Sequence, residues 1–82
     1  MHLTISIEQP GKRLALVGPH DRNLRVLREA FGVQVVQRDD DLKLIGESSQ
    51  VAKAAAVIGQ LQKKLRNQEF LNDRDVADAM RN

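Results

Sequence analysis

The chain has 82 residues, a net charge of +2, no cysteine, and only two residues among phenylalanine, tryptophan and tyrosine. This length predicts one small domain, and the missing cysteines exclude a disulfide framework and a cysteine-ligated zinc site. The longest apolar run covers residues 54–58, far short of the ~20 residues that a membrane-spanning helix needs. We therefore expect a cytoplasmic protein that has no contact with a membrane.

Residues 2–8 alternate between polar and apolar side chains, with Leu3, Ile5 and Ile7 on one face. A period of two predicts a strand with one buried and one solvated face, and the Gln-Pro-Gly sequence that follows ends it. Residues 12–17 are too few for their periodicity to separate a helical turn from a strand. We expect a short helix there.

The sequence Gly-Pro-His-Asp at residues 18–21 predicts a tight turn, because Gly18 can adopt a positive φ and Pro19 fixes its own φ. Either Asp21 caps the helix that follows, or Pro19 lies near its first turn. Gly32 is expected to end this helix. One arc of the helix is apolar and holds Leu24, Leu27, Ala30 and Phe31. The opposite arc is polar and holds Arg22, Arg25, Arg28 and Glu29.

Two strand-like segments, residues 33–37 and 42–46, lie on either side of three consecutive aspartates. We interpret Asp39–Asp41 as the tip of a hairpin that joins these strands. A divalent-cation loop is the alternative, but no pattern of a glycine and a distal glutamate supports it. Adjacent carboxylates at a hairpin tip also point in different directions, which favours the turn.

Residues 46–49, Gly-Glu-Ser-Ser, are expected to end the second of these strands and to provide a serine cap for a long helix. That helix extends to about Arg66. A linker over residues 67–72 and a short last helix, capped by Asn72 or Asp73, complete the chain. The apolar edge of the last helix consists of Val76, Ala77 and Met80.

The resulting order is β-α-α-β-β-α with one further helix. It predicts an α+β fold in two layers, with a three-stranded antiparallel sheet covered on one face by helices.

Basic residues gather in the first half of the chain, where residues 12–28 hold five bases and one acid. Such a patch can neutralise phosphates, although a capping turn and a solvated helix face account for the same residues without a ligand. Both interpretations remain open. The candidate nucleic-acid-binding residues are Lys12, Arg13, Gly18, His20, Arg22, Arg25 and Arg28. The sequence contains no catalytic or metal-binding constellation, so no cofactor is expected for this chain.

The predicted order, with a glycine turn between the first two helices, resembles that of the type I KH domain. Residues 16–18, Leu-Val-Gly, resemble the lead-in to the KH Gly-x-x-Gly loop, and residues 24–33 resemble the helix that follows. Residues 42–46, with Val51 and Ala54, resemble the last KH strand and its packing helix. This resemblance covers most of the chain.

A narrower resemblance is to the N-terminal domain of PhoH-like proteins, which are phosphate-starvation-inducible P-loop ATPases. It rests on the segments GPHDRNL, FGVQVVQRDDDLKLIGE and LNDRDVADAM. In that family a KH-like domain precedes an ATPase domain that uses ATP and Mg, and the resemblance implies a role in RNA metabolism. This chain contains no Gly-x-x-x-x-Gly-Lys-Ser/Thr motif. We therefore expect a domain excised from a longer protein, with a KH-like domain at residues 1–66 and, at residues 67–82, a linker and short helix leading to the absent ATPase domain.

The turn departs from the KH pattern at its fourth position, which is Asp21, and Pro19 removes a backbone N–H that a KH loop would offer to nucleic acid. A carboxylate at this place repels phosphate. We therefore expect weak, salt-sensitive binding of single-stranded RNA, and no enzymatic activity in this chain. The alternative is an interaction or homo-oligomerisation module without nucleic-acid binding, whose contact surfaces are the sheet edges and the last helix at Val76 and Met80.

Overall fold

The computed structural model describes residues 1–81, and within this range it confirms the predicted α+β class. Asn82, at the end of the predicted C-terminal segment, lies outside the described residues. The strands are β1 (His2–Ser6), β2 (Gln34–Arg38) and β3 (Asp41–Ile45). The helices are α1 (Arg13–Val17), α2 (Arg22–Phe31), α3 (Ser48–Leu65) and α4 (Asp73–Arg81), and short 3-10 turns occupy η1 (Pro10–Lys12) and η2 (Pro19–Asp21). None of the helices in residues 1–81 has the length and apolar character needed to cross a membrane.

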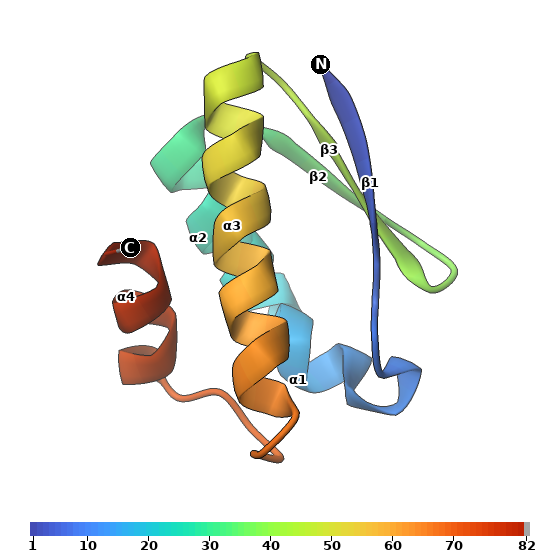
Figure 1. Cartoon of the computed structure of the whole chain (residues 1–82), viewed down its shortest axis with the longest axis vertical. Coiled ribbons are helices and arrows are strands. Elements are labelled where there is room, and N and C mark those ends of the chain that lie inside the picture. Colours follow the sequence, from blue (N-terminus) through green and yellow to red (C-terminus); the bar gives the residue numbers. More distant parts are fainter. Residues whose placement is uncertain (82) are drawn as a thin grey trace.

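The sheet is antiparallel and has the strand order β1-β3-β2. The central strand β3 pairs with both neighbours, so that Leu44 lies between Leu3 of β1 and Val35 of β2. Helix α3 lies between α4 and the sheet in Figure 1, with α1 and α2 beside it. All three strands therefore turn one face toward the helices, as the alternation in the sequence predicts.

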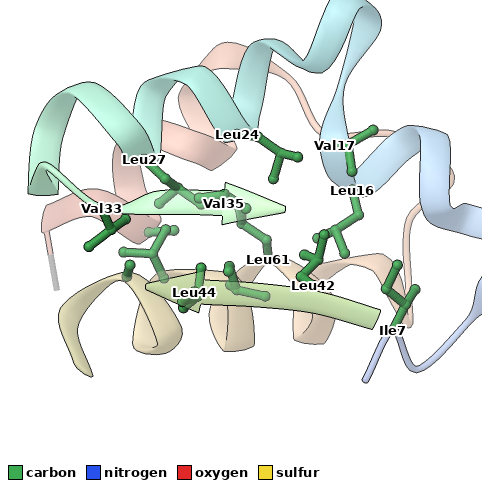
Figure 2. Close-up of a cluster of buried hydrophobic side chains, with 14 of the residues drawn as sticks. Ile7, Leu16, Val17, Leu24, Leu27, Val33, Val35, Leu42, Leu44 and Leu61 are labelled. Atoms are coloured by element: carbon green, nitrogen blue, oxygen red, sulfur yellow. The ribbon is translucent and has the colours of Figure 1, made fainter. Parts of the chain in front are cut away.

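The hydrophobic core fills the space between the sheet and the helices. Leu42 and Leu44 of β3 are completely buried there, against Leu24 and Leu27 of α2 and Leu61 of α3 (Figure 2). Burying one leucine side chain stabilises a fold by roughly 1.5–3 kcal/mol. The stability of this small domain therefore depends on the layer that β3 shares with α2 and α3.

The tip of the hairpin is shorter than predicted. Arg38 and Asp41 pair across β2 and β3, so Asp41 belongs to a strand and only Asp39 and Asp40 form the turn. Asp39 has a φ of 47°, a left-handed conformation that aspartate tolerates better than most residues. A two-residue connection with a positive φ matches the twist of the two strands.

Alanines lie on different helix faces from those predicted. Ala30 of α2 is exposed, and in α4 the buried alanine is Ala79 while Ala77 is exposed. An alanine side chain buries little apolar area, so the packing of its larger neighbours decides its face. Val76 and Met80 pack against the core of the chain itself, which removes much of the apolar edge that was predicted for contact with another molecule.

Helix α3 is capped by a carboxylate, so the predicted serine cap is wrong. Glu47 occupies the N-cap position, accepts a bond from the backbone N–H of Gln50 (3.2 Å), and accepts another from the hydroxyl of Ser49. These bonds, that of Ser49 foremost, lower the pKa of Glu47. At α4, Asn72 provides a cap as predicted, because its Oδ1 accepts from the N–H of Asp75 (2.8 Å) and Asp75 accepts from that of Asn72 (3.0 Å).

The side chain of Gln62 ties α3 to the end of β1. This residue is only 6% exposed, its Oε1 accepts from the N–H of Glu8 (2.7 Å), and its Nε2 donates to the carbonyl of Ser6 (3.2 Å). We expect Gln62→Leu to lower the free energy of unfolding by about 2 kcal/mol, because both backbone groups lose their partner while the volume is kept. Urea denaturation measures this effect. Gln60→Leu, on the exposed face of the same helix, is the control, and an equal loss in both variants would contradict the role of the Gln62 amide.

Candidate nucleic-acid interface

The turn before α2 has the tight geometry that the sequence predicts. Gly18 has φ 81° and ψ 164°, and His20 and Asp21 are both left-handed, with φ values of 54° and 57°. The N–H of Asp21 donates to the carbonyl of Gly18 (3.1 Å). A Cβ on Gly18 would lie 3.1 Å from the side-chain amide of Asn23. The glycine is therefore needed for close packing inside the chain, and Gly18 itself is buried.

Asp21 does not cap α2, so that alternative is wrong, whereas Pro19 begins the 3-10 turn η2 that leads directly into the helix. The left-handed backbone of Asp21 turns the carboxylate away from the first turn of the helix, and within residues 1–81 it makes no capping bond. Its Oδ1 instead accepts a bond from Nε2 of Gln37 on β2 (3.0 Å). The carboxylate thereby joins the turn to the sheet.

Arg28 reinforces the same side of the molecule. Its Nη2 donates to the carbonyl of Val35 (2.8 Å), and the side chain is partly buried. Together with the bond between Gln37 and Asp21, this contact joins β2 to both α2 and η2. Arg28 is therefore part of the scaffold, and the side of the turn that faces β2 is occupied by the chain's own side chains.

Three polar side chains remain exposed at the turn, those of His20, Arg22 and Arg25. Arg25 is exposed and donates from Nη2 to the carbonyl of His20 (3.1 Å), which holds its guanidinium beside the turn. His20 is exposed as well. Arg22 forms an ion pair with Asp73 (2.7 Å), and its side chain remains 57% exposed. These groups lie near the N-terminal end of α2, where the helix dipole favours an anion.

Lys12 and Arg13 do not join this group. Nζ of Lys12 bonds to the carbonyls of Leu65 and Gln68, the latter at 2.9 Å, and lies 3.9 Å from the carboxylate of Glu69. Lys12 therefore holds the end of α3 and the segment after it against η1. Arg13 is half-buried, and its side chain has no hydrogen bond or ion pair among residues 1–81.

A groove of about 840 Å³ lies on the other side of the turn, between α1 and residues 69–73. Its lining includes Lys12, Gly18, His20 and Arg22 of the predicted site, together with Leu14 and Phe70. The last two are the most exposed large apolar side chains in the described part of the chain, at 73% and 78%. The ion pairs of Lys12 with Glu69 and of Arg22 with Asp73 connect the two walls.

Sequence reasoning missed the groove, two residues that shape the turn, and Phe70, which lines the groove. Gln37 and Asn23 act through partners that are distant in the sequence or buried, and no local pattern indicates them. The sequence does carry a signal for Phe70, which is a large apolar residue within the mostly polar segment 67–72. Exposed apolar side chains that gather in one patch, as Phe70 and Leu14 do at the groove, mark contact surfaces.

No family model matches the chain, and no curated protein matches its sequence. Among residues 1–81, no group of three or more histidine, cysteine, aspartate or glutamate residues is placed to hold a metal ion.

Proposed function

We propose that this chain is a KH-like accessory domain of a PhoH-type ATPase, and that it binds single-stranded RNA weakly at the groove beside the 18–21 turn. In this proposal the domain acts as a cytoplasmic binding module, and ATP and Mg belong to the ATPase domain that it serves. The β-α-α-β-β-α order and the glycine turn before α2 support the assignment. The observation that carries the binding proposal is the groove, which places the exposed ring of Phe70 beside His20 and Arg22.

The groove offers the two kinds of contact that single-stranded RNA uses. Phe70 provides a face on which a base can stack, a contact worth about 1–3 kcal/mol per base. Arg22 and His20 in the groove, with Arg25 next to it, provide donors for phosphates. Asp73 neutralises part of the charge of Arg22, and Lys12 is engaged with backbone carbonyls. Few phosphates are therefore neutralised, and binding is weak and salt-sensitive.

The groove differs in place from the surface that the KH resemblance implies. The bridge between Asp21 and Gln37 and that between Arg28 and Val35 occupy the α2–β2 side, whereas Asp21 is not part of the groove lining. The carboxylate of Asp21 is consequently directed at Gln37, and its repulsion of a phosphate in the groove is small.

We expect Phe70→Ala to weaken the binding of a labelled single-stranded RNA by about five-fold or more, because one stacked base is lost. Fluorescence anisotropy at two salt concentrations measures the change. Phe70 is largely exposed, so the fold should be unaffected. Arg22→Gln should weaken binding as well and reduce the dependence on salt, since a phosphate contact is removed.

Two controls separate the groove from the alternatives. Phe70→Leu keeps an apolar side chain but removes the aromatic face, so it should resemble Phe70→Ala if stacking matters. Asp21→Gly removes a carboxylate on the α2–β2 side and should leave affinity nearly unchanged. A clear gain of affinity in Asp21→Gly, with no loss in Phe70→Ala, would place the RNA on the α2–β2 side and overturn the groove. No binding of the unmodified chain at low salt would overturn the function.

A further inference from the structure

The outer edge of β1 carries backbone groups that point away from the sheet. Met1 exchanges hydrogen bonds with Gly46 (2.7 and 3.0 Å), and Ile7 donates to Asp40 (2.8 Å). In an antiparallel ladder these bonds alternate, so the odd-numbered residues of this segment face β3. The residues whose N–H and C=O face outward are His2, Thr4 and Ser6.

The two edges of the sheet differ. At the β2 edge, the outward carbonyl of Val35 accepts from Arg28, and α2 lies alongside. At the β1 edge, Gln62 bonds to the carbonyl of Ser6. The N–H and C=O of Thr4, in the middle of the strand, have no partner within residues 1–81.

The β1 edge also lacks the features that usually prevent pairing with another strand. Proteins protect such edges with charged side chains, proline or a bulge. The segment from His2 to Ile7 contains no lysine, arginine, aspartate, glutamate or proline. Leu3 and Ile5 are only half-buried, although both belong to the face that covers the core. An additional strand at this edge would cover them further.

We propose that β1 pairs with β1 of a second copy of this chain, antiparallel and about a two-fold axis at Thr4. The two sheets then form one continuous sheet across the dimer. This register places the two Thr4 residues opposite each other, so that their outward N–H and C=O groups bond between copies. It also places His2 opposite the partner's Ser6, whose carbonyl keeps its bond to Gln62. On the inner face, Leu3 lies opposite the partner's Ile5, so apolar side chains meet.

The partner at this edge is a second copy of the chain, because the sequence of β1 is complementary to itself in this register. Every pair in this register is polar with polar or apolar with apolar, and no like charges face each other. Threonine pairs and pairs of threonine or serine with polar residues are favourable across antiparallel strands. A two-fold contact of the same surface on both subunits is also the commonest arrangement of homo-oligomers. The RNA groove lies on α1 and residues 69–73, so the dimer does not depend on the proposed RNA binding.

Light scattering over a concentration series tests the dimer. We expect the mean mass to rise from the 9.2 kDa of one chain toward twice that value as the concentration increases from about 10 µM to about 1 mM. Thr4→Pro should keep the monomer at all concentrations, because its missing N–H points outward and no bond to β3 is lost. Thr4→Lys should do the same, since it places two positive charges opposite each other.

Val36→Lys is the matched control. Val36 lies in the same row of the sheet as Thr4, with Lys43 between them, but on the opposite edge strand, so the added charge should leave the dimer intact. Amide resonances in residues 2–6 should shift with concentration in the unmodified chain and not in Thr4→Lys. A chain that stays monomeric up to about 1 mM, or a dimer that Thr4→Lys does not weaken, overturns the proposal.

Discussion

Gly18→Ala should lower the free energy of unfolding by about 2–4 kcal/mol, because its backbone conformation is almost restricted to glycine. Gly18 has φ 81° and ψ 164°, and an added Cβ would lie 3.1 Å from the buried amide of Asn23 and 3.2 Å from its backbone nitrogen. Asn23 cannot move aside freely, since its Nδ2 donates to the carbonyl of Leu16 (3.0 Å). A chain of this length has only about 4–12 kcal/mol of stability in total, so the loss is a large fraction of it.

Gly32→Ala is the control for the backbone contribution alone. Gly32 ends α2 in a left-handed conformation with φ 63°, but no atom lies within 4 Å of an added Cβ. We expect this variant to lose only about 1 kcal/mol, the cost of a left-handed alanine. Urea denaturation measures the free energy of unfolding of both variants, and an unchanged m-value shows that only stability has changed. Equal losses at the two glycines would show that contact with Asn23 contributes nothing.

Local signals in the sequence predicted most of the elements. The alternation in residues 2–8, the Gly-Pro turn and the stop at Gly32 each depend on the conformational preferences of a few neighbouring residues. Residues 12–17 were ambiguous by the same criterion, and the structure confirms a helix, α1. What selects the helix is the placement of Leu16 and Val17 in the core, which a run of six residues cannot specify.

The site was harder to predict because its charged residues act through distant partners. Lys12 bonds to carbonyls more than fifty residues away, Asp21 bonds to Gln37 on β2, and Arg28 bonds to a strand edge. The sequence shows a cluster of bases but not which of them the scaffold uses. Counting bases therefore overestimates the charge available to nucleic acid. Among the candidate residues, His20, Arg22 and Arg25 are the ones whose polar groups remain exposed near the turn.

Leu42→Ala should lower the free energy of unfolding by about 3–5 kcal/mol. Leu42 is 0% exposed and lies in the middle strand, within the cluster of buried side chains that it shares with Leu61 (Figure 2). Both neighbouring strands pair with β3, so the sheet cannot close around the cavity without disturbing its ladders. The free energy of unfolding that remains should be small enough that a measurable fraction of the molecules is unfolded at room temperature.

Leu14→Ala makes the same chemical change on α1 and is the matched control. Leu14 is 73% exposed beside the groove, so its truncation leaves no internal cavity, and we expect a change within about 0.5 kcal/mol. Urea denaturation of both variants, with circular dichroism to follow the helices, gives the comparison. Similar losses at the two leucines would contradict the exposed position of Leu14, and with it the shape of the groove beside Phe70. A large difference supports both the buried layer at β3 and the outward direction of Leu14, on which the shape of the groove depends.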